Sequence, residues 1–448
     1  MFFLVLTLLP VLLCTGFPFF HMLNALPVLI KKDYVSIIIR KNRSISILVP
    51  CFNEEDMLQT AIIGMKKIGY ENFEIIYIND GSTDGTLSLL QESLDLKKVN
   101  RSARNRIAYK QVKGFYHSRR YSNVFVVDKE NGGKADALNA GIDYAKNELV
   151  LTLDADSILE PDALQMINRG FQDRSVIAAG GMVHVLQGRK KFSTPSSVSL
   201  KLKHILRFQI LEYLKGFYIY KASLARVKAL AIISGSFGVF DRRLLLELGG
   251  YRDTVGEDID ITLRFQTYLL SNPTKRILFI PEAVSYTECP ETWRGLFIQR
   301  IRWQKAFVDC AIHYHKILLK TVFNRSLSFF FTVDAFFVGT FFTYVVVFYL
   351  LLLIIFPNPH SIIIILTYLI ALIVFNLLYT IIALYITSKY GTTFRGLDKI
   401  RLLETIALDL IVYRFVLMFF IIAGTIAYFL NKEGWKKVAR TGRDYENR

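Results

Sequence analysis

Long apolar segments near both ends of the chain limit most strongly what it can fold into. Residues 328–356 and 361–387 are each longer than the roughly 20 residues that a helix needs to cross a bilayer. A third apolar segment, 402–430, follows them, and residues 1–30 contain no lysine or arginine. A cleaved signal peptide would carry a basic start and a small-residue cleavage site, so we expect residues 1–30 to be an uncleaved anchor. The sequence therefore predicts a membrane protein with transmembrane α-helices.

The basic residues indicate which side of the membrane the segments face. The net charge is +17, and Lys31 and Lys32 directly follow the first apolar segment. Because cytoplasmic loops are enriched in lysine and arginine, we expect the polar centre of the chain in the cytoplasm. The loop 388–401 and the tail 431–448 are both basic, although one complete span between them would place them on opposite sides. Either residues 402–430 do not cross fully, or the tail breaks the charge rule.

Three other features mix charged and apolar residues. Residues 196–231 predict a long amphipathic helix, which either lies along the membrane or packs on a sheet. Residues 294–320 predict a helix in the headgroup plane, because tryptophan, arginine and lysine alternate there with aliphatic residues. Asp409 and Arg414 predict either an ion pair that faces a polar channel or a segment whose first half stays at the interface.

The polar centre alternates short apolar runs with helical patterns. Strands are expected at 46–49, 73–78, 123–127 and 149–153, which predicts an α/β fold with a mostly parallel sheet covered on both faces. Residues 97–120 hold nine lysines and arginines and no acid, and they either contact anionic lipid or form a solvated, mobile insertion. The four cysteines lack Cys-x-x-Cys spacing, which argues against a zinc site or a disulfide framework.

Two acids directly follow the fourth predicted strand. In the run from Leu151 to Ile158, apolar residues alternate and lead into Asp154 and Asp156. Ligands of an open α/β sheet bind outside the carboxyl ends of its strands, and a Mg²⁺-type ion takes one or two carboxylates together with substrate phosphates. The pair is thus a candidate metal site, although an Asp-x-Asp pair also occurs by chance in many loops.

Two other turns have the chemistry of a nucleotide site. Asp80 ends the second strand, where its carboxylate could accept hydrogen bonds from a ribose or a base, although a turn with Asp84 as a helix cap explains the same residues. Gly132 and Gly133 allow close approach of a ligand to the backbone, and Lys134 opens a helix whose N-terminus favours anions. The second turn suits a diphosphate, or it is a plain junction between a loop and a helix.

Two later motifs are candidates for acceptor chemistry. Asp258 opens a helix next to Glu257 and is a candidate general base, although acids in a first helical turn often only complement the helix dipole. In the run that begins at Gln299, Arg302 could bridge phosphate oxygens and Trp303 could stack on a sugar ring. An ordinary interfacial helix would also contain these residues.

Together these motifs resemble family 2 glycosyltransferases, and specifically their membrane-embedded processive branch of cellulose, hyaluronan and poly-N-acetylglucosamine synthases. The resemblance extends from about Ser44 to Ala306. It rests on Val-Pro-Cys-Phe-Asn-Glu-Glu at 49–55, Asn-Asp-Gly-Ser-Thr-Asp at 79–84, Gly-Gly-Lys-Ala-Asp-Ala-Leu-Asn at 132–139, Asp-Ala-Asp at 154–156, Glu-Asp at 257–258 and Gln-x-x-Arg-Trp at 299–303.

The resemblance implies a GT-A-type, Rossmann-like fold and a role for each motif residue. The residues implied to bind the nucleotide-sugar are Pro50, Asn53, Glu54, Asp80, Lys134 and Asp154. Asp154 and Asp156 would hold Mg²⁺ or Mn²⁺ on the diphosphate of a UDP-sugar, and Asp258 would deprotonate the acceptor hydroxyl. The acceptor and pyrophosphate platform would consist of Glu257, Gln299, Arg302 and Trp303. Gly256 departs from the family pattern, which usually has threonine there.

We expect a membrane-bound, inverting transferase that adds sugars to a polysaccharide, with export as a coupled step and accessory export proteins as partners. The alternative is a single transfer to a lipid-linked acceptor, which would not need the run at 299–303. A scaffold without activity is disfavoured by the intact acids, and a nucleic-acid binder by the placement of the basic residues beside membrane segments. The expected domains are an anchor (1–30), a cytoplasmic transferase domain (31–293), interfacial helices (294–327), a transmembrane region (328–430) and a basic tail (431–448) that loosely resembles a gating segment. The plasma membrane is the expected location.

Overall fold

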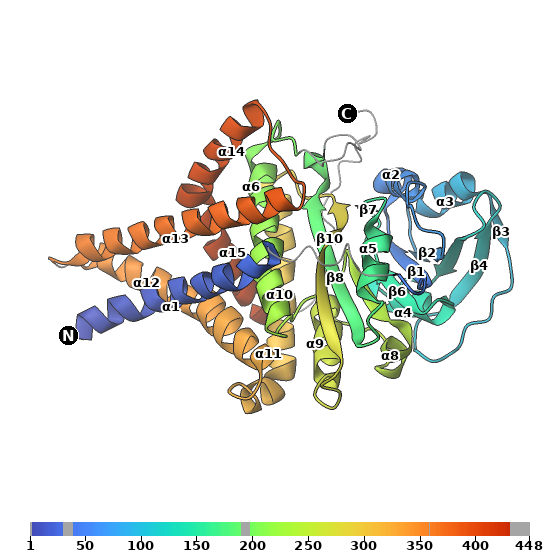
Figure 1. Ribbon diagram of the computed structural model, residues 1–448, viewed down its shortest axis with the longest axis horizontal. Helices are drawn as coiled ribbons and strands as arrows, with labels where there is room; N and C mark the ends of the chain where they lie inside the picture. Colours follow the sequence, from blue (N-terminus) through green and yellow to red (C-terminus); the bar gives the residue numbers. More distant parts are fainter. Residues whose placement is uncertain (1, 30–38, 190–197, 358, 431–448) are drawn as a thin grey trace. The chain divides into compact units, whose positions relative to one another are not determined.

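The computed structural model describes residues 2–29, 39–189, 198–357 and 359–430 (Figure 1). The chain divides into two compact units. We call the first the helical unit (Met1–Lys31, Gly188–Ala231 and Glu291–Lys437) and the second the sheet unit (Lys32–Gln187, Ile232–Pro290 and Val438–Arg448). The predicted basic tail at 431–448, with its gating-like segment, lies outside the described residues, as do Lys31 and Lys32.

The sheet unit is built on one mixed ten-stranded sheet, with the order β3-β4-β5-β2-β1-β6-β9-β8-β10-β7. Its strands are β1 (Ile45–Cys51), β2 (Phe73–Asp80), β3 (Leu96–Lys98), β4 (Val112–Ser118), β5 (Val124–Lys129), β6 (Leu149–Thr152), β7 (Ser157–Leu159), β8 (Val176–Val185), β9 (Gly238–Asp241) and β10 (Arg276–Thr287). Pairing is parallel across β5-β2-β1-β6 and between β8 and β10. The predicted α/β, GT-A-type fold class is confirmed.

The central strands are apolar because both faces of the sheet are covered. Every residue of β6 is buried, and so is every residue of β1 except Pro50. The flanking helices are α2 (Glu55–Met65), α3 (Thr86–Leu94), α4 (Lys134–Tyr144), α5 (Ala163–Gly170), α8 (Arg242–Glu247) and α9 (Glu257–Tyr268). Of these, α4 packs on β1 and β2, and α5 packs on β10. Parallel β1, β2, β5 and β6 therefore deliver the loops that follow them to one edge of the sheet.

The helical unit contains the apolar segments. Its elements are α1 (Phe2–Ala25), η1 (Leu26–Leu29), α6 (His204–Lys215), η4 (Gly216–Lys221), α7 (Ala222–Arg226), α10 (Trp293–Lys320), α11 (Ser326–Phe329), η5 (Phe330–Phe341), α12 (Phe342–Ile355), α13 (Ser361–Lys389), α14 (Leu397–Leu408), η6 (Asp409–Tyr413) and α15 (Arg414–Leu430). Three helical stretches in the described part of the chain are long and apolar enough to cross a membrane: Ser326–Ile355, Ser361–Lys389 and Leu397–Leu430. The predicted membrane character of these segments is thus supported.

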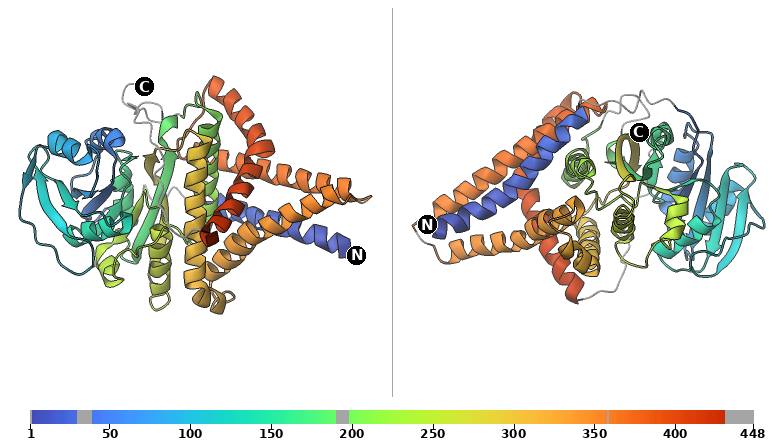
Figure 2. Two further views of the ribbon diagram at one scale, coloured as in Figure 1. Left: turned by 180° about the vertical axis from the view of Figure 1, so that it is seen from behind. Right: turned by 60° about the horizontal axis from the view of Figure 1, so that its bottom comes forward.

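Helices far apart in sequence pack together within this unit. The long helix expected at 196–231 is observed as α6, η4 and α7, and it contacts α1 and α13. Figure 2 shows α1 and α13 side by side, and α10 runs along α15. The predicted pairing of Arg414 with Asp409 is found at 3.6 Å, but Lys215 Nζ lies closer to the same carboxylate, at 2.7 Å. Asn376 donates to that carboxylate as well, at 3.2 Å.

Candidate active site

Two loops that follow neighbouring parallel strands are locked together by hydrogen bonds. The Asn53 side chain accepts a bond from the Thr83 amide at 2.8 Å, and the Asn53 amide donates to Ser82 Oγ at 3.0 Å. The Glu54 amide donates to Thr86 Oγ1 at 2.8 Å. Asn53 has φ 55°, a left-handed conformation that asparagine tolerates better than most residues. The loops after β1 and β2 therefore form one rigid wall.

Asp80 fixes the glycine loop in front of α4. Its carboxylate is buried and accepts bonds from the Gly132 amide at 3.0 Å and the Gly133 amide at 2.8 Å. Lys129 Nζ donates to the same carboxylate at 2.7 Å. Gly133 has φ +89°, where a residue with a side chain would be strained. In this structure Asp80 shapes the loop, and its contact with a nucleotide remains a prediction.

Sequence reasoning missed Lys129. This fully buried lysine ends β5, and its ammonium group also pairs with the Asp136 carboxylate. Because an isolated buried charge is costly, the two carboxylates are what make its burial tolerable. A lysine at the end of an apolar strand pattern could have identified this residue from the sequence.

Lys134 joins three motifs that are distant in sequence. Its Nζ lies 2.8 Å from the Asp154 carboxylate and 3.0 Å from the Glu257 carboxylate. Burial acts to lower the pKa of Lys134, but the charges of Asp154 and Glu257 outweigh it and raise the pKa above its ordinary value. Burial raises the pKa of Glu257, against the lowering effect of Lys134, and the neighbouring charge of Asp258 raises it further. Lys134 is therefore a permanent cation between the loop after β6 and the start of α9.

A second residue that sequence reasoning missed, Gly235, packs against this group. A Cβ atom on Gly235 would lie 3.0 Å from Lys134 Nζ, 3.5 Å from the Glu257 carboxylate and 3.6 Å from Asp258 Cβ. Asp258 is half-buried, and its carboxylate accepts bonds from the amides of Gly235 at 3.4 Å and Ile259 at 2.8 Å. A side chain at position 235 would crowd the Lys134 ammonium group, so glycine suits this position.

The two acids of the Asp-Ala-Asp motif have different surroundings. The Asp154 side chain is 31% exposed, whereas Asp156 is buried and its Oδ1 accepts bonds from the hydroxyls of Ser157 at 3.2 Å and Thr287 at 3.1 Å. Among the described residues, no group of three or more His, Cys, Asp or Glu side chains could hold a metal ion. The two carboxylates fit a hard cation that takes its other ligands from phosphate and water, and they do not form a closed protein site.

Gln299, Arg302 and Trp303 lie on α10 in the helical unit. Gln299 is buried, and Trp303 is 41% exposed. The guanidinium carbon of Arg300 lies 4.1 Å from the centre of the Trp303 ring, and Arg300 also pairs with Glu212 at 2.9 Å. This cation–π contact holds the indole in a fixed orientation.

The fold is that of a GT-A-type glycosyltransferase. A similar solved structure is "Mannosyltransferase PcManGT from Pyrobaculum calidifontis in complex with GDP-Man and Mn2+", with a TM-score of 0.57 and 18% identity over 96% of this chain and 99% of that chain. The profile of glycosyl transferase family 2 matches residues 46–233, and that of glycosyl transferase family group 2 matches residues 149–387. The chain belongs to glycosyl transferase family group 2, and the predicted family is confirmed.

Two curated relatives, from two organisms, are both named poly-beta-1,6-N-acetyl-D-glucosamine synthase. The chain is 30% identical over 280 residues to the poly-beta-1,6-N-acetyl-D-glucosamine synthase of Staphylococcus aureus (strain MSSA476). It is 28% identical over 318 residues to the synthase of the same name from Staphylococcus epidermidis. These matches cover 62% and 70% of this chain, and 57% and 66% of the respective relatives. The chain therefore spans less than two thirds of each relative's length.

Proposed function

We propose that this protein is a membrane-bound, inverting glycosyltransferase that moves N-acetylglucosamine from a UDP-sugar to a growing polysaccharide. The enzyme class follows from family membership. The names of the relatives support the choice of sugar. The charge pattern of the sequence supports a location in the plasma membrane, with the sheet unit in the cytoplasm.

The observation that carries the proposal is the position of Lys134. One ammonium group contacts Asp154 of the Asp-Ala-Asp motif and Glu257, the neighbour of Asp258. One compact group within the sheet unit thus contains Lys134, Asp154 and Asp258. The family resemblance implies that these residues contact the donor, hold the metal and act as the base, respectively.

In the proposed reaction, Asp258 accepts the proton of the acceptor hydroxyl while that oxygen attacks the anomeric carbon. The bond from that carbon to the diphosphate oxygen breaks in the same displacement, which inverts the anomeric centre. Two backbone amides bond to the Asp258 carboxylate and orient it, so the base is placed before the acceptor arrives. Lys134 supplies a fixed positive charge where the diphosphate leaves.

Asp154 and Asp156 would hold Mg²⁺ or Mn²⁺ in this proposal. When bound, the cation offsets the negative charge that develops on the diphosphate leaving group. The partly exposed Asp154 is the accessible ligand, and the hydroxyls of Ser157 and Thr287 orient the buried Asp156. These two hydroxyl donors keep the buried Asp156 carboxylate in one orientation.

We favour repeated addition of sugars to one polysaccharide, and the alternative is a single transfer to a lipid-linked acceptor. The exposed ring of Trp303, held by Arg300, provides a flat surface on which an acceptor sugar can stack. A single transfer to a lipid-linked acceptor would not require such a surface. Accessory proteins would assist export of the product.

The test is to incubate membranes that contain the protein with radiolabelled UDP-sugars and GDP-mannose, and to size the products. We expect incorporation from UDP-N-acetylglucosamine into a polymer, with no incorporation after chelation of divalent cations. A short product that extracts into organic solvent would favour the alternative. Incorporation from GDP-mannose alone would overturn the proposed donor.

A further inference from the structure

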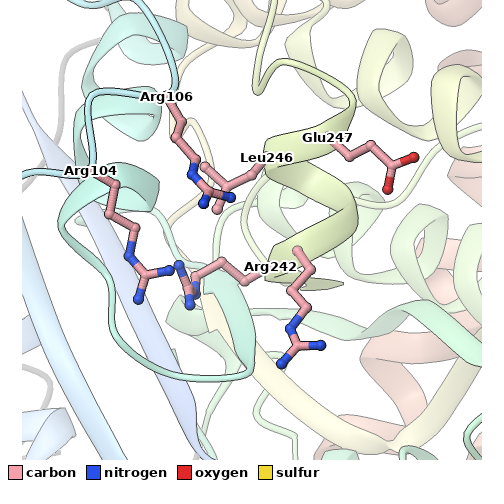
Figure 3. A pocket seen from close by; sticks show the side chains of 6 residues that line it. Arg104, Arg106, Arg242, Leu246 and Glu247 are labelled. Atoms are coloured by element: carbon pink, nitrogen blue, oxygen red, sulfur yellow. The ribbon is translucent and has the colours of Figure 1, made fainter.

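A pocket in the sheet unit is lined mainly by arginine side chains (Figure 3). Its lining consists of Arg104, Arg106, Arg242, Arg243, Leu246 and Glu247, around a cavity of about 650 Å³. Small-molecule sites commonly have volumes of roughly 300–1,000 Å³, so a ligand of moderate size fits. None of the lining residues belongs to the group around Lys134, so this pocket has its own set of side chains.

The positive charge in this pocket is largely uncompensated. The lining carries four guanidinium groups and one carboxylate, that of Glu247, which points away from Arg104, Arg106 and Arg242 in Figure 3. Outside the lining, the charges of Glu74 and Asp241 act on Arg242. In the described part of the chain, the side chains of Arg104, Arg106 and Arg243 form no ion pair or hydrogen bond. Cations gathered without counter-charges repel one another, and an anion between them would relieve that repulsion.

Arg242 is held in place at the base of this cluster. It is buried, its Nε donates to the Asn147 carbonyl at 2.6 Å, and its backbone amide donates to the Glu148 carbonyl at 3.0 Å. Its buried Nη1 has no hydrogen-bond partner among the described residues. Burial lowers the pKa of Arg242, as do the charges of Arg104 and Arg106, against the raising effect of Glu74 and Asp241. The contact to the Asn147 carbonyl therefore fixes the side chain of Arg242, the most buried of the pocket's arginines, in one position.

The loop that carries the first two arginines is also fixed. The Asp143 carboxylate accepts bonds from the amides of Asn105 at 2.8 Å and Arg106 at 3.2 Å, and from the hydroxyl of Tyr109 at 2.8 Å. The charge of Asp143 is therefore used to hold the loop backbone, and it forms no ion pair with the guanidinium groups. A fixed loop places Arg104 and Arg106 opposite α8 before any ligand binds.

We propose that this pocket binds a phosphate-bearing anion, such as a phosphomonoester or a diphosphate group. Guanidinium groups match phosphate oxygens with paired, charge-assisted hydrogen bonds, and four of them favour an anion with more than one negative charge. The phosphate can belong to a dissolved metabolite or to a lipid headgroup. The proposal does not depend on the sugar-transfer reaction.

The test measures binding of inorganic pyrophosphate to the full-length protein by calorimetry, in detergent and with EDTA present. We expect Arg104→Gln/Arg106→Gln to weaken binding roughly a hundredfold, since each charged hydrogen bond contributes on the order of tenfold. The matched control is Lys97→Gln/Lys98→Gln, which removes the same charge from exposed positions on β3. Thermal unfolding of each variant checks that it is folded.

A second measurement, in nanodiscs, distinguishes a lipid headgroup from a dissolved metabolite as the source of the phosphate. If a headgroup fills the pocket, phosphatidylglycerol should weaken pyrophosphate binding relative to phosphatidylcholine in the wild type but not in Arg104→Gln/Arg106→Gln. Equal binding in both lipids indicates a dissolved ligand. Unchanged binding by the folded Arg104→Gln/Arg106→Gln variant would overturn the proposal. So would an equal loss in the Lys97→Gln/Lys98→Gln control, because binding would then follow overall charge.

Discussion

Lys134 Nζ lies 2.8 Å from the carboxylate of Asp154, so the first residue of α4 is tied to the loop that follows β6. The same ammonium group contacts the buried Glu257 at 3.0 Å, at the start of α9. Asp154 and Glu257 are separated by about a hundred residues in the chain, yet one side chain joins them. This group is the centre of the proposed active site.

Replacing Lys134 tests that centre. Lys134→Gln would leave Glu257 buried without its cation, and we expect sugar transfer to fall on the order of a hundredfold, as for the loss of one preorganised charge in an active site. Lys146→Gln is the matched control, since Lys146 is exposed just beyond the end of α4. Transfer rates measured at saturating UDP-sugar compare the variants. A rate for Lys134→Gln equal to that of the control would remove Lys134 from the mechanism.

Replacing Asp154 tests the role of the metal. Asp154→Asn removes the accessible carboxylate, and we expect UDP binding to lose its dependence on Mg²⁺ or Mn²⁺ and transfer to fall on the order of a hundredfold. Asp162→Asn serves as a control, because Asp162 is exposed and its side chain makes no capping bond to α5. Titration of UDP with and without EDTA provides the measurement. Metal-dependent UDP binding that survives in Asp154→Asn would rule this carboxylate out as a ligand.

The acceptor platform is tested through the length of the product. Trp303→Ala removes the exposed ring beside Arg300, and we expect polymer elongation to fall roughly tenfold while hydrolysis of the UDP-sugar changes little. Trp293→Ala, at the start of the same helix, is the comparison. Both activities are followed in one reaction by sizing the polymer and counting the released sugar. If elongation and hydrolysis declined in parallel, the ring would have no specific role in holding the acceptor.

The burial of His184 should make the stability of the protein depend on pH. Burial lowers the pKa of His184, on β8, from its ordinary value of 6.5 to about 4. The unfolded chain therefore binds a proton more readily between these values, and stability falls as the pH drops through that window. Between pH 7.5 and pH 5, the titration of His184 is expected to lower the free energy of unfolding by about 2 kcal/mol.

The measurement is the unfolding midpoint of the full-length protein at the two pH values. His184→Phe should reduce the difference between them. An identical pH dependence in the wild type and His184→Phe would contradict the predicted effect of burial.

The local sequence predicted the core of the sheet well. The strands that became β1, β2, β5 and β6 each contain a short, mostly apolar run, and such runs are readable without tertiary information. Asp84 was expected to cap a helix that begins at Gly85, but α3 begins at Thr86 and Gly85 is its N-cap. The Asp84 carboxylate instead accepts a bond from the Thr86 amide at 3.0 Å, from one residue before the cap. The four-residue β9 was not predicted, because it is defined by antiparallel pairing with β6 and β8.

The candidate site was predictable as a set of motifs but not as a geometry. The charge of Lys134 was apparent from the sequence, whereas its shared contact with Asp154 and Glu257 depends on packing between distant segments. Gly235 and Lys129 belong to no motif that was recognised, and their importance comes from what lies beside them. The segment at 97–120, expected either to contact anionic lipid or to form a solvated, mobile insertion, contains most of the edge strand β3 and all of β4. It also supplies Arg104 and Arg106 to the arginine pocket.

The most direct test of the account is the rate of sugar transfer by purified Asp258→Asn. UDP affinity is measured on the same preparation, and Asp253→Asn, at an exposed position just before the motif, is the control. We predict that Asp258→Asn binds UDP as the wild type does and transfers N-acetylglucosamine at least about a hundredfold more slowly, because only the proton acceptor has been lost. Transfer at the wild-type rate by Asp258→Asn would contradict the proposed mechanism.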